Sequence, residues 1–316
     1  MRKSKGEIKM STDNMLLDVR NLSVSFNMYS RRFEQKEINV ISNLSVSVKE
    51  GEILAVAGSS GSGKSLLAHA VLGILPNNAK VNGEILYRGK QLTGDQQQML
   101  RGKEIALVPQ SVEYLDPLMR VGKQVMGVSG SKDKQKTLFK KYGLGNFVEK
   151  MYPFQLSGGM ARRVLVSTAV ISQGKLIIAD EPTPGLSKEM AQTAMGHFRA
   201  LADEGRGIML ITHDLDLALA YADRIAVFYA GTTVEIAAAE DFRTGIEALR
   251  HPYSKALWRA IPQNGFQPIE GSQPYAGDLP KGCLFAPRCP QRTKACEQRP
   301  SMRTLRGGEV CCIHAT

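Results

Sequence analysis

The sequence lacks a long apolar run. None of its 316 residues falls in a stretch that reaches the roughly 18 uncharged apolar residues needed for a membrane-spanning helix. No secretory hydrophobic region follows the basic start Met1–Lys5. We therefore expect a cytoplasmic chain that does not cross a membrane by itself.

A continuous basic stripe is also missing, although the net charge is +11 and the pI is about 9.4. The Lys and Arg residues are dispersed, and aromatic residues do not alternate with them as they do on surfaces that track nucleic acid. Such a dispersed excess suits a surface near an anionic membrane leaflet. We expect no nucleic-acid partner.

Cysteine is absent from most of the chain. All five cysteines lie in the last 34 residues, which argues against random core positions: Cys283, Cys289, Cys296, Cys311 and Cys312. Four cysteines suffice for an iron–sulfur cluster or a zinc site. The gaps of five, six and fourteen residues differ from the tight pairs of common zinc motifs. His314 is an alternative ligand.

A glycine-rich stretch, Gly58–Ser65, fits the P-loop pattern G-x-x-x-x-G-K-[ST]. The apolar run Ile53–Ala57 precedes it and the helix-like run Leu66–Leu72 follows it. Backbone N–H groups of such a loop turn toward an anion, and the helix N-terminus adds partial positive charge. Lys64 would reach the β- and γ-phosphates of a nucleotide, and Ser65 would bind Mg²⁺. The predicted nucleotide-binding residues are Gly58, Ser59, Gly61, Ser62, Gly63, Lys64, Ser65 and Leu66.

The stretch Leu156–Met160 resembles the signature loop of ABC-transporter ATPases. Two further motifs of that family follow apolar strands in the expected order, with Gln110 matching the Q-loop and His213 the switch histidine. The resemblance covers about residues 16–262. It implies an α/β fold: a P-loop ABC ATPase cassette with a RecA-like parallel sheet core, an antiparallel β edge and a helical subdomain, followed by a Cys-rich C-terminal extension.

The run Leu176–Glu181 looks like the Walker B strand of the same family. Its two carboxylates emerge at the carboxyl end of a buried strand, where α/β sheets bind ligands. Asp180 would hold Mg²⁺ together with Ser65, and Glu181 would polarise the attacking water. The resemblance assigns Gln110 both to the metal and to catalysis, and it implies ATP and Mg²⁺ as ligands.

The resemblance also implies that the signature residues Ser157, Gly158 and Gly159 act on ATP bound by a partner cassette. Their N–H groups stand at the start of a predicted helix and would make a second anion site. No internal repeat supplies a second cassette within this chain. We therefore expect a dimer of cassettes with ATP at the seam.

The adenine ring should stack on an aromatic residue near the end of the first strand, Leu16–Phe26. Phe26 is our choice, and Tyr29 and Phe33 in the segment that follows are the alternatives. One position departs from the family pattern, because Ser187 replaces an Asp that typically bridges the two cassettes. A non-identical partner cassette could supply the missing function.

Two C-terminal stretches, His251–Leu257 and Gly282–Pro290, resemble the oligopeptide, dipeptide and nickel importer branch of the family. That resemblance implies a [4Fe–4S] cluster bound by Cys283, Cys289, Cys296 and either Cys311 or Cys312, with zinc as a second choice. Uncoordinated thiols stay open, and a disulfide is disfavoured in the reducing cytosol.

We expect the chain to divide into a disordered N-terminus (1–14), the ATPase domain (15–262) with its helical subdomain at about 111–156, and a linker with the Cys-rich extension (263–316). Residues 231–262 look helical. The resemblance implies a peripheral ATPase at the cytoplasmic face of the membrane. It would energise import of peptides or of nickel or metal chelates, with two transmembrane permease subunits and an extracytoplasmic substrate-binding protein. The alternative function is a soluble ABC ATPase acting on ribosomes or nucleic acid.

Overall fold

The computed structural model describes residues 14–29, 35–127 and 130–316. The predicted disordered N-terminus therefore lies outside the described residues except at Asn14, and Phe33 lies outside them as well. None of the helices within these ranges has the length and apolar content needed to span a bilayer.

The centre of the fold is an eight-stranded sheet with the strand order β11-β12-β10-β9-β3-β8-β7-β6. Five of its strands are mutually parallel: β3 (Ile53–Gly58), β6 (Ile105–Val108), β7 (Leu176–Asp180), β8 (Gly207–Ile211) and β9 (Arg224–Tyr229). Parallel strands place their carboxyl ends at one edge, so the loops after these five strands meet there.

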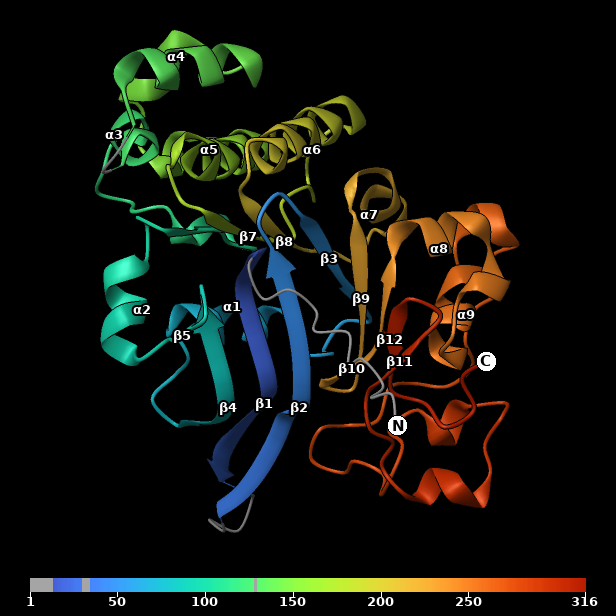
Figure 1. Cartoon of the computed structure of the whole chain (residues 1–316). Coiled ribbons are helices and arrows are strands. Elements are labelled where there is room, and N and C mark those ends of the chain that lie inside the picture. The colour runs from blue at the N-terminus through green and yellow to red at the C-terminus, as the bar shows by residue number, and fades with distance from the viewer. Residues whose placement is uncertain (1–13, 30–34, 128–129) are drawn as a thin grey trace, which may run out of the picture.

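A second, antiparallel sheet packs beside the first, in the order β2-β1-β4-β5. Its long strands β1 (Met15–Tyr29) and β2 (Gln35–Lys49) form a twisted ribbon, completed by β4 (Ala79–Tyr87) and the short β5 (Lys90–Gln91). It occupies the lower left of Figure 1. These two sheets confirm the predicted cassette fold, a parallel core with an antiparallel edge.

Helices cover the main sheet and form an arm above it (Figure 1). The arm comprises α3 (Val121–Met126), α4 (Lys132–Lys141) and three single turns, and α5 (Gly158–Ile171) and α6 (Lys188–Asp203) connect it to the sheet. The single turns are Val112–Tyr114, Asn146–Lys150 and Pro153–Gln155. The other helices are α1 (Lys64–Leu72), α2 (Gly94–Leu100), α7 (Leu215–Tyr221), α8 (Ala239–Thr244) and α9 (Pro252–Arg259).

The central strands are apolar at successive positions because both faces of the sheet are buried. On β3, Ile53 and Ala55 face a core shared with α5 and α6, while Leu54 and Val56 face a core shared with α1 and the antiparallel sheet. The same alternation runs through β7, β8 and β9. Burial on both faces fixes the central strands, and with them the edge at which their carboxyl ends meet.

The region after β9 corrects one prediction. Residues 232–238 form a strand, β10 (Thr232–Ala238), although residues 231–262 were expected to be helical. The hairpin of β11 (Arg303–Leu305) and β12 (Gly308–Val310) pairs with β10, so the C-terminal extension adds strands to the main sheet. That long-range partner is what stabilises strand over helix.

A buried ion pair anchors this hairpin. The Arg250 and Glu235 side chains are 2% and 0% exposed, and Arg250 Nη1 lies 3.3 Å from Glu235 Oε1. Arg250 Nε also donates to the carbonyl of Leu305 at 2.6 Å. The guanidinium thus joins β10 to the hairpin.

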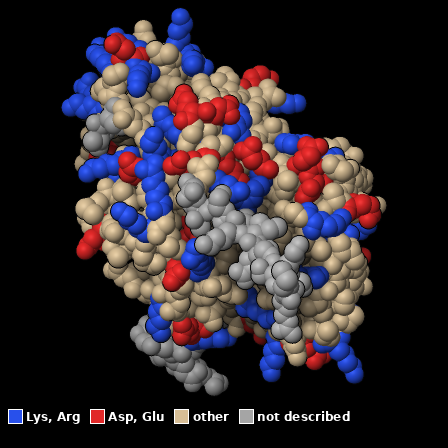
Figure 2. Space-filling model, viewed as in Figure 1, with Lys and Arg blue, Asp and Glu red and all other residues tan. Residues whose placement is uncertain are grey.

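Charge on the visible surface is mixed (Figure 2). Lys and Arg are interspersed with Asp and Glu, and basic side chains gather over α4, whose sequence carries five lysines between residues 132 and 141. The distribution agrees with the dispersed charge expected from the sequence.

Candidate nucleotide site

The loop between β3 and α1 has the shape of an anion cradle. Gly63 has a φ of 93°, a left-handed conformation that favours glycine and turns the chain into the helix. At Gly58 an added Cβ would lie 2.3 Å from the carbonyl oxygen of Phe228 on the neighbouring strand β9. Both glycines are therefore required for the loop to pack against the sheet.

Lys64 is buried inside this loop. Its Nζ donates to the carbonyls of Gly58 at 2.9 Å and Ser59 at 3.0 Å. Burial lowers the pKa of Lys64, and the nearby carboxylates of Glu181 and Asp180 oppose that change. The ammonium is positioned where the phosphates of a nucleotide would enter the cradle.

Asp180 and Ser65 offer oxygen ligands to a hard cation. Asp180 is 3% exposed, and its Oδ1 has no hydrogen-bond partner among the described residues. Burial raises the pKa of Asp180, while a hydrogen bond from Ser65 lowers it. Carboxylate and hydroxyl oxygens are ligands that Mg²⁺ accepts, so this pair fits the predicted metal.

Glu181 follows Asp180 in a left-handed backbone conformation, with a φ of 49°. Its N–H donates to the carbonyl of Ile211 on β8 at 2.9 Å. Its Oε2 lies 2.6 Å from Nδ1 of His213, whose side chain is 67% exposed. The structure therefore brings together the two residues predicted to act on the attacking water.

An open cavity of about 680 Å³ joins these groups. It is lined by Val40, Ser60, Gly61, Gly63, Lys64, Ser65, Leu66, Gln110, Glu181, Pro184 and His213. A cavity of this size accommodates a nucleotide. Gln110, Glu181 and His213 come from the loops after β6, β7 and β8, which meet at the carboxyl edge as the parallel topology requires.

The residue that stacks on adenine stays a prediction. Phe26 is not among the residues that line this cavity and packs instead against the core between the main sheet, α1 and the antiparallel sheet. The side chain of Tyr29 and all of Phe33 lie outside the described residues. Val40 on β2 lines the cavity on this side.

Arg162 is a site residue that the sequence did not single out. From α5 it donates to the carbonyls of Pro109 at 3.1 Å and Gln110 at 2.6 Å. Burial lowers the pKa of Arg162, and the carboxylates of Glu181 and Asp180 raise it. In the sequence it stands beside Arg163 and reads as ordinary surface charge, so no local pattern could have identified it.

The signature residues stand apart from the cavity of the same chain. Ser157 caps α5, because its Oγ accepts from the N–H of Met160 at 3.3 Å. Ser157 and Gly158 are exposed, and a Cβ on Gly158 would meet no atom within 4 Å. Ser187, at the position of the family's Asp, caps α6 in the same way, accepting from Met190.

Four of the five cysteines line one small cavity: Cys283, Cys289, Cys296 and Cys312, together with His251, Phe285 and His314. Cys311 lies outside it and donates its S–H to the carbonyl of Pro300 at 3.1 Å. Burial raises the pKa of the Cys283 and Cys289 thiols, and it raises that of Cys312 to about 11. Within the described ranges, no three His, Cys, Asp or Glu side chains are arranged to hold a metal ion.

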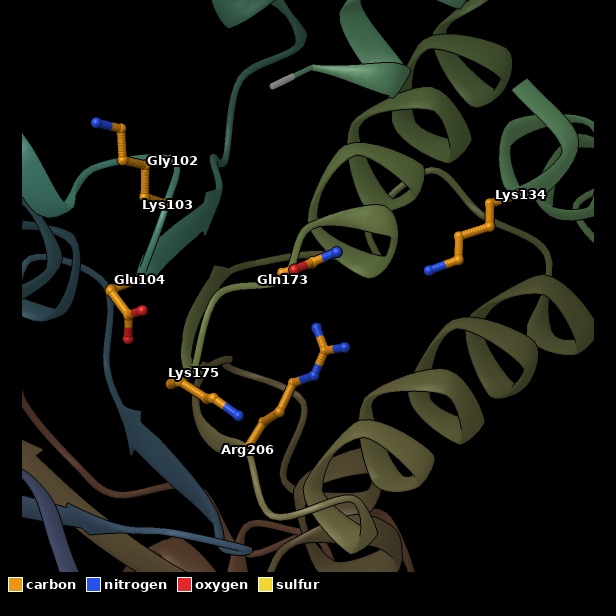
Figure 3. A pocket seen from close by; sticks show the side chains of 7 residues that line it. All are labelled: Gly102, Lys103, Glu104, Lys134, Gln173, Lys175 and Arg206. Carbon is orange, nitrogen blue, oxygen red and sulfur yellow. The ribbon is translucent and has the colours of Figure 1, made fainter. Parts of the chain in front are cut away.

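A separate pocket lies at the opposite edge of the sheet, before the starts of β6, β7 and β8 (Figure 3). Its lining residues are Gly102, Lys103, Glu104, Lys134, Gln173, Lys175 and Arg206. Arg206 is already engaged, donating to the carbonyl of Ser172 at 2.6 Å and lying 3.7 Å from Glu204. Lys103 points away from the centre of the pocket. It shares no lining residue with the cavity at the carboxyl edge.

Two segments of the chain match known protein families. Residues 41–184 match the family described as "ABC transporter". Residues 234–296 match "Oligopeptide/dipeptide transporter, C-terminal region". The second match covers most of β10, the anchoring Arg250 and three of the cysteines.

Curated relatives match nearly the whole chain. The oligopeptide transport ATP-binding protein OppD of Haemophilus influenzae is 33% identical and covers 94% of this chain and 96% of its own. The dipeptide transport ATP-binding protein DppD of Escherichia coli is 34% identical, and the alignment covers 95% of this chain and 96% of that protein. Among solved structures, a dimeric ATP-binding cassette bound to ADP and Pi has a TM-score of 0.62 at 23% identity. The superposition covers 71% of this chain and 99% of that one, and it supports the fold. The chain therefore belongs to the ATP-binding subunits of ABC transporters, in the branch with the oligopeptide/dipeptide transporter C-terminal region.

Proposed function

We propose that this ABC ATPase energises the import of peptides. Its relatives at 33–34% identity are named for oligopeptide and dipeptide transport. Neither of these two relatives is named for nickel or metal chelates. The C-terminal region also disfavours the ribosome or nucleic-acid alternative, because that region is described for peptide transporters.

In this proposal the P-loop binds the phosphates, and the groups beside it bind Mg²⁺. Lys64 and the loop amides offset negative charge on the β- and γ-phosphates, since phosphoryl transfer depends mainly on positioning and charge stabilisation. Ser65, Asp180 and the Gln110 side chain would hold Mg²⁺, which adds positive charge beside the phosphates. The unpartnered Oδ1 of Asp180 is the observation that favours this ligand set.

Glu181 and His213 would act on the attacking water. Glu181 accepts a water proton, and the short contact from His213 Nδ1 fixes the orientation of its carboxylate. The left-handed backbone at Glu181 directs the side chain toward the cavity, and the contact to Ile211 holds that conformation in place. The proposed hydrolysis therefore depends on the Glu181 carboxylate, which follows β7 and is held in place by contacts to Ile211 on β8 and to His213 after β8.

The exposed signature residues support a dimer. Ser157 and Gly158 are exposed at the start of α5, where an anion from another subunit could bind the helix N-terminus. We propose that the partner is a non-identical paralogue, because Ser187 caps a helix where the family carries a bridging Asp. The assembly would include two permease subunits and an extracytoplasmic substrate-binding protein, with this chain at the cytoplasmic face of the membrane.

The test of this function is reconstitution of the complete transporter in liposomes. We expect ATP hydrolysis to rise when the binding protein is supplied with a short peptide and not when it is supplied with Ni²⁺. Glu181→Gln should abolish both hydrolysis and peptide uptake. Copurification of ribosomal RNA in place of permease subunits would refute the proposal.

We further propose that residues 263–316 form a metal-binding extension of the ATPase domain (15–262), and that the metal is a [4Fe–4S] cluster. Convergence of four thiols on one cavity supports this, and it favours Cys312 over Cys311 as the fourth ligand beside Cys283, Cys289 and Cys296. Binding would require the neutral thiols to ionise, because thiolates are the ligands, and their side chains to rearrange, because they are not arranged to hold a metal among the described residues.

The cluster is tested by purification without oxygen. We expect iron and sulfide in the wild type, with loss of iron in Cys312→Ser and full iron in the matched control Cys311→Ser. Iron-free protein, or equal iron in the two variants, would contradict the assignment. Zinc in place of iron and sulfide would identify the second choice.

A further inference from the structure

The C-terminal extension touches the nucleotide cradle. Gln273, in the segment predicted to be a linker, accepts from Oγ of Ser59 with its Oε1 at 2.7 Å. The same oxygen accepts from the backbone N–H of Ala230 at 3.2 Å. One side chain therefore joins the first turn of the P-loop to the residue that follows β9.

Ser59 is a structurally sensitive point of the cradle. Its carbonyl accepts from Lys64 Nζ, so a displacement of Ser59 also displaces an anchor of the phosphate-binding lysine. Tyr253 on α9 reaches the same residue: burial raises the pKa of Tyr253, and hydrogen bonds with the Ser59 hydroxyl and backbone oppose that rise. Two residues beyond the parallel core thus converge on one position of the loop.

The segment that carries Gln273 is held at both ends. We name residues 269–277 the strap. Arg288 donates to the carbonyls of Glu270 at 2.8 Å and Ile269 at 3.1 Å, and Lys36 Nζ donates to the carbonyl of Gly277 at 2.9 Å. A segment clamped in this way presents Gln273 at a defined place, unlike a free tether.

The strap is also connected to the cysteine cavity. Arg288 is the neighbour of Cys289, and its guanidinium lies 5.9 Å from the ring centroid of Tyr229, the last residue of β9. Phe285, which lines that cavity, packs against Tyr229 and Tyr253 with ring centroids 5.2 and 5.3 Å apart. A continuous set of contacts runs from the cysteines to Ser59.

We propose that Gln273 is a positioning residue for the nucleotide, acting through Ser59, and that the C-terminal extension thereby sets the affinity of this ATPase for ATP. The inference rests on the ATPase family and not on the peptide cargo or the iron–sulfur cluster. A loop that is already ordered binds its ligand more tightly, because less conformational entropy is lost on binding. Removing the acceptor should weaken ATP binding without changing the chemical step.

The experiment uses Gln273→Met in the full chain, which keeps the volume of the side chain and removes its acceptor. Gln267→Met is the matched control, because Gln267 is an exposed residue of the same extension whose side chain makes no hydrogen bond among the described residues. The readouts are the ATP dissociation constant by calorimetry in a Glu181→Gln background, the KM and kcat of hydrolysis in the wild-type background, and the Tm.

Loss of the hydrogen bond to Ser59 should raise the Kd and KM of Gln273→Met roughly 2- to 10-fold, with kcat close to that of Gln267→Met. Loss of the second hydrogen bond, from the Ala230 N–H, should lower the Tm relative to Gln267→Met. Tyr253→Phe should act in the same direction while keeping its ring packing. In a Ser59→Ala background, Gln273→Met should add no further loss, because the partner hydroxyl is already gone. An unchanged or tighter Kd would overturn the proposal, and so would a loss that is fully additive with Ser59→Ala.

Discussion

The buried pair of Arg250 and Glu235 offers the most direct test of how the extension is attached. Replacing Arg250 with Met removes a guanidinium that contacts Glu235, Asp241 at 2.8 Å and the carbonyl of Leu305. Glu235 would stay buried, accepting only from the backbone N–H groups of Arg250 at 3.0 Å and His251 at 2.8 Å. A carboxylate left without its counter-charge in a buried site is strongly destabilising.

The size of the effect follows from the burial of both partners. Breaking such a pair reduces the free energy of unfolding by about 3–5 kcal/mol. In a chain of this size each 1 kcal/mol lowers Tm by roughly 2–4 °C, so a decrease of about 10 °C is expected. The exposed pair of Arg20 and Asp18, 2.7 Å apart with the Arg side chain 53% exposed, is the matched control. Arg20→Met should change stability by about 1 kcal/mol or less.

Thermal unfolding of Arg250→Met, Arg20→Met, Glu235→Gln and the double variant Glu235→Gln/Arg250→Met provides the assay. The double variant should recover part of the lost stability, because the buried charge is gone and the amide oxygen still accepts one backbone N–H. Equal Tm values for Arg250→Met and Arg20→Met would refute the reasoning. A double variant whose decrease in Tm equals the sum of the decreases in Glu235→Gln and Arg250→Met would refute it as well.

Three further outcomes are expected. Glu181→Gln should bind ATP as well as the wild type and lose nearly all turnover, measured by nucleotide filter binding and phosphate release; undiminished hydrolysis would contradict its role as the group that accepts a water proton. Asp180→Asn should raise Tm in the absence of nucleotide and Mg²⁺ while abolishing Mg²⁺-dependent hydrolysis. Because burial raises the pKa of Asp180, its ionisation lowers stability as pH rises past the ordinary carboxyl range, so the gain in Tm should vanish below pH of about 4. Arg162→Met should reduce kcat because the Gln110 carbonyl loses its donor, whereas Arg101→Met, an exposed arginine at the opposite edge of the sheet, before β6, should leave kcat unchanged.

The candidate nucleotide site could be predicted from the sequence because its residues belong to short, local motifs. The P-loop needs glycine at residue 63, and the two carboxylates at the end of β7 follow a run whose apolar pattern indicates burial on both faces of a sheet. Parallel topology then places Gln110, Glu181 and His213 at one edge without further information. The proximity of His213 to Glu181 follows directly from the pairing of β7 with β8.

The C-terminal region could not be predicted in the same way. Residues 232–238 form a strand only because β9 and the distant β12 pair with them, and local propensity does not report a partner some 70 residues away. The choice between Cys311 and Cys312 likewise depends on which side chain of the adjacent pair faces the cavity, since the two are equivalent in spacing.

The sequence by itself determined the cassette and the motifs proposed to bind and hydrolyse ATP, since these residues lie next to one another in the chain or at the ends of recognisable strands. Only the tertiary structure decided that Arg162 holds the Q-loop and that Gln273 reaches Ser59. These two contacts join residues more than 50 and 200 positions apart, and side chains at such separation meet only after the sheet and its clamped extension have packed.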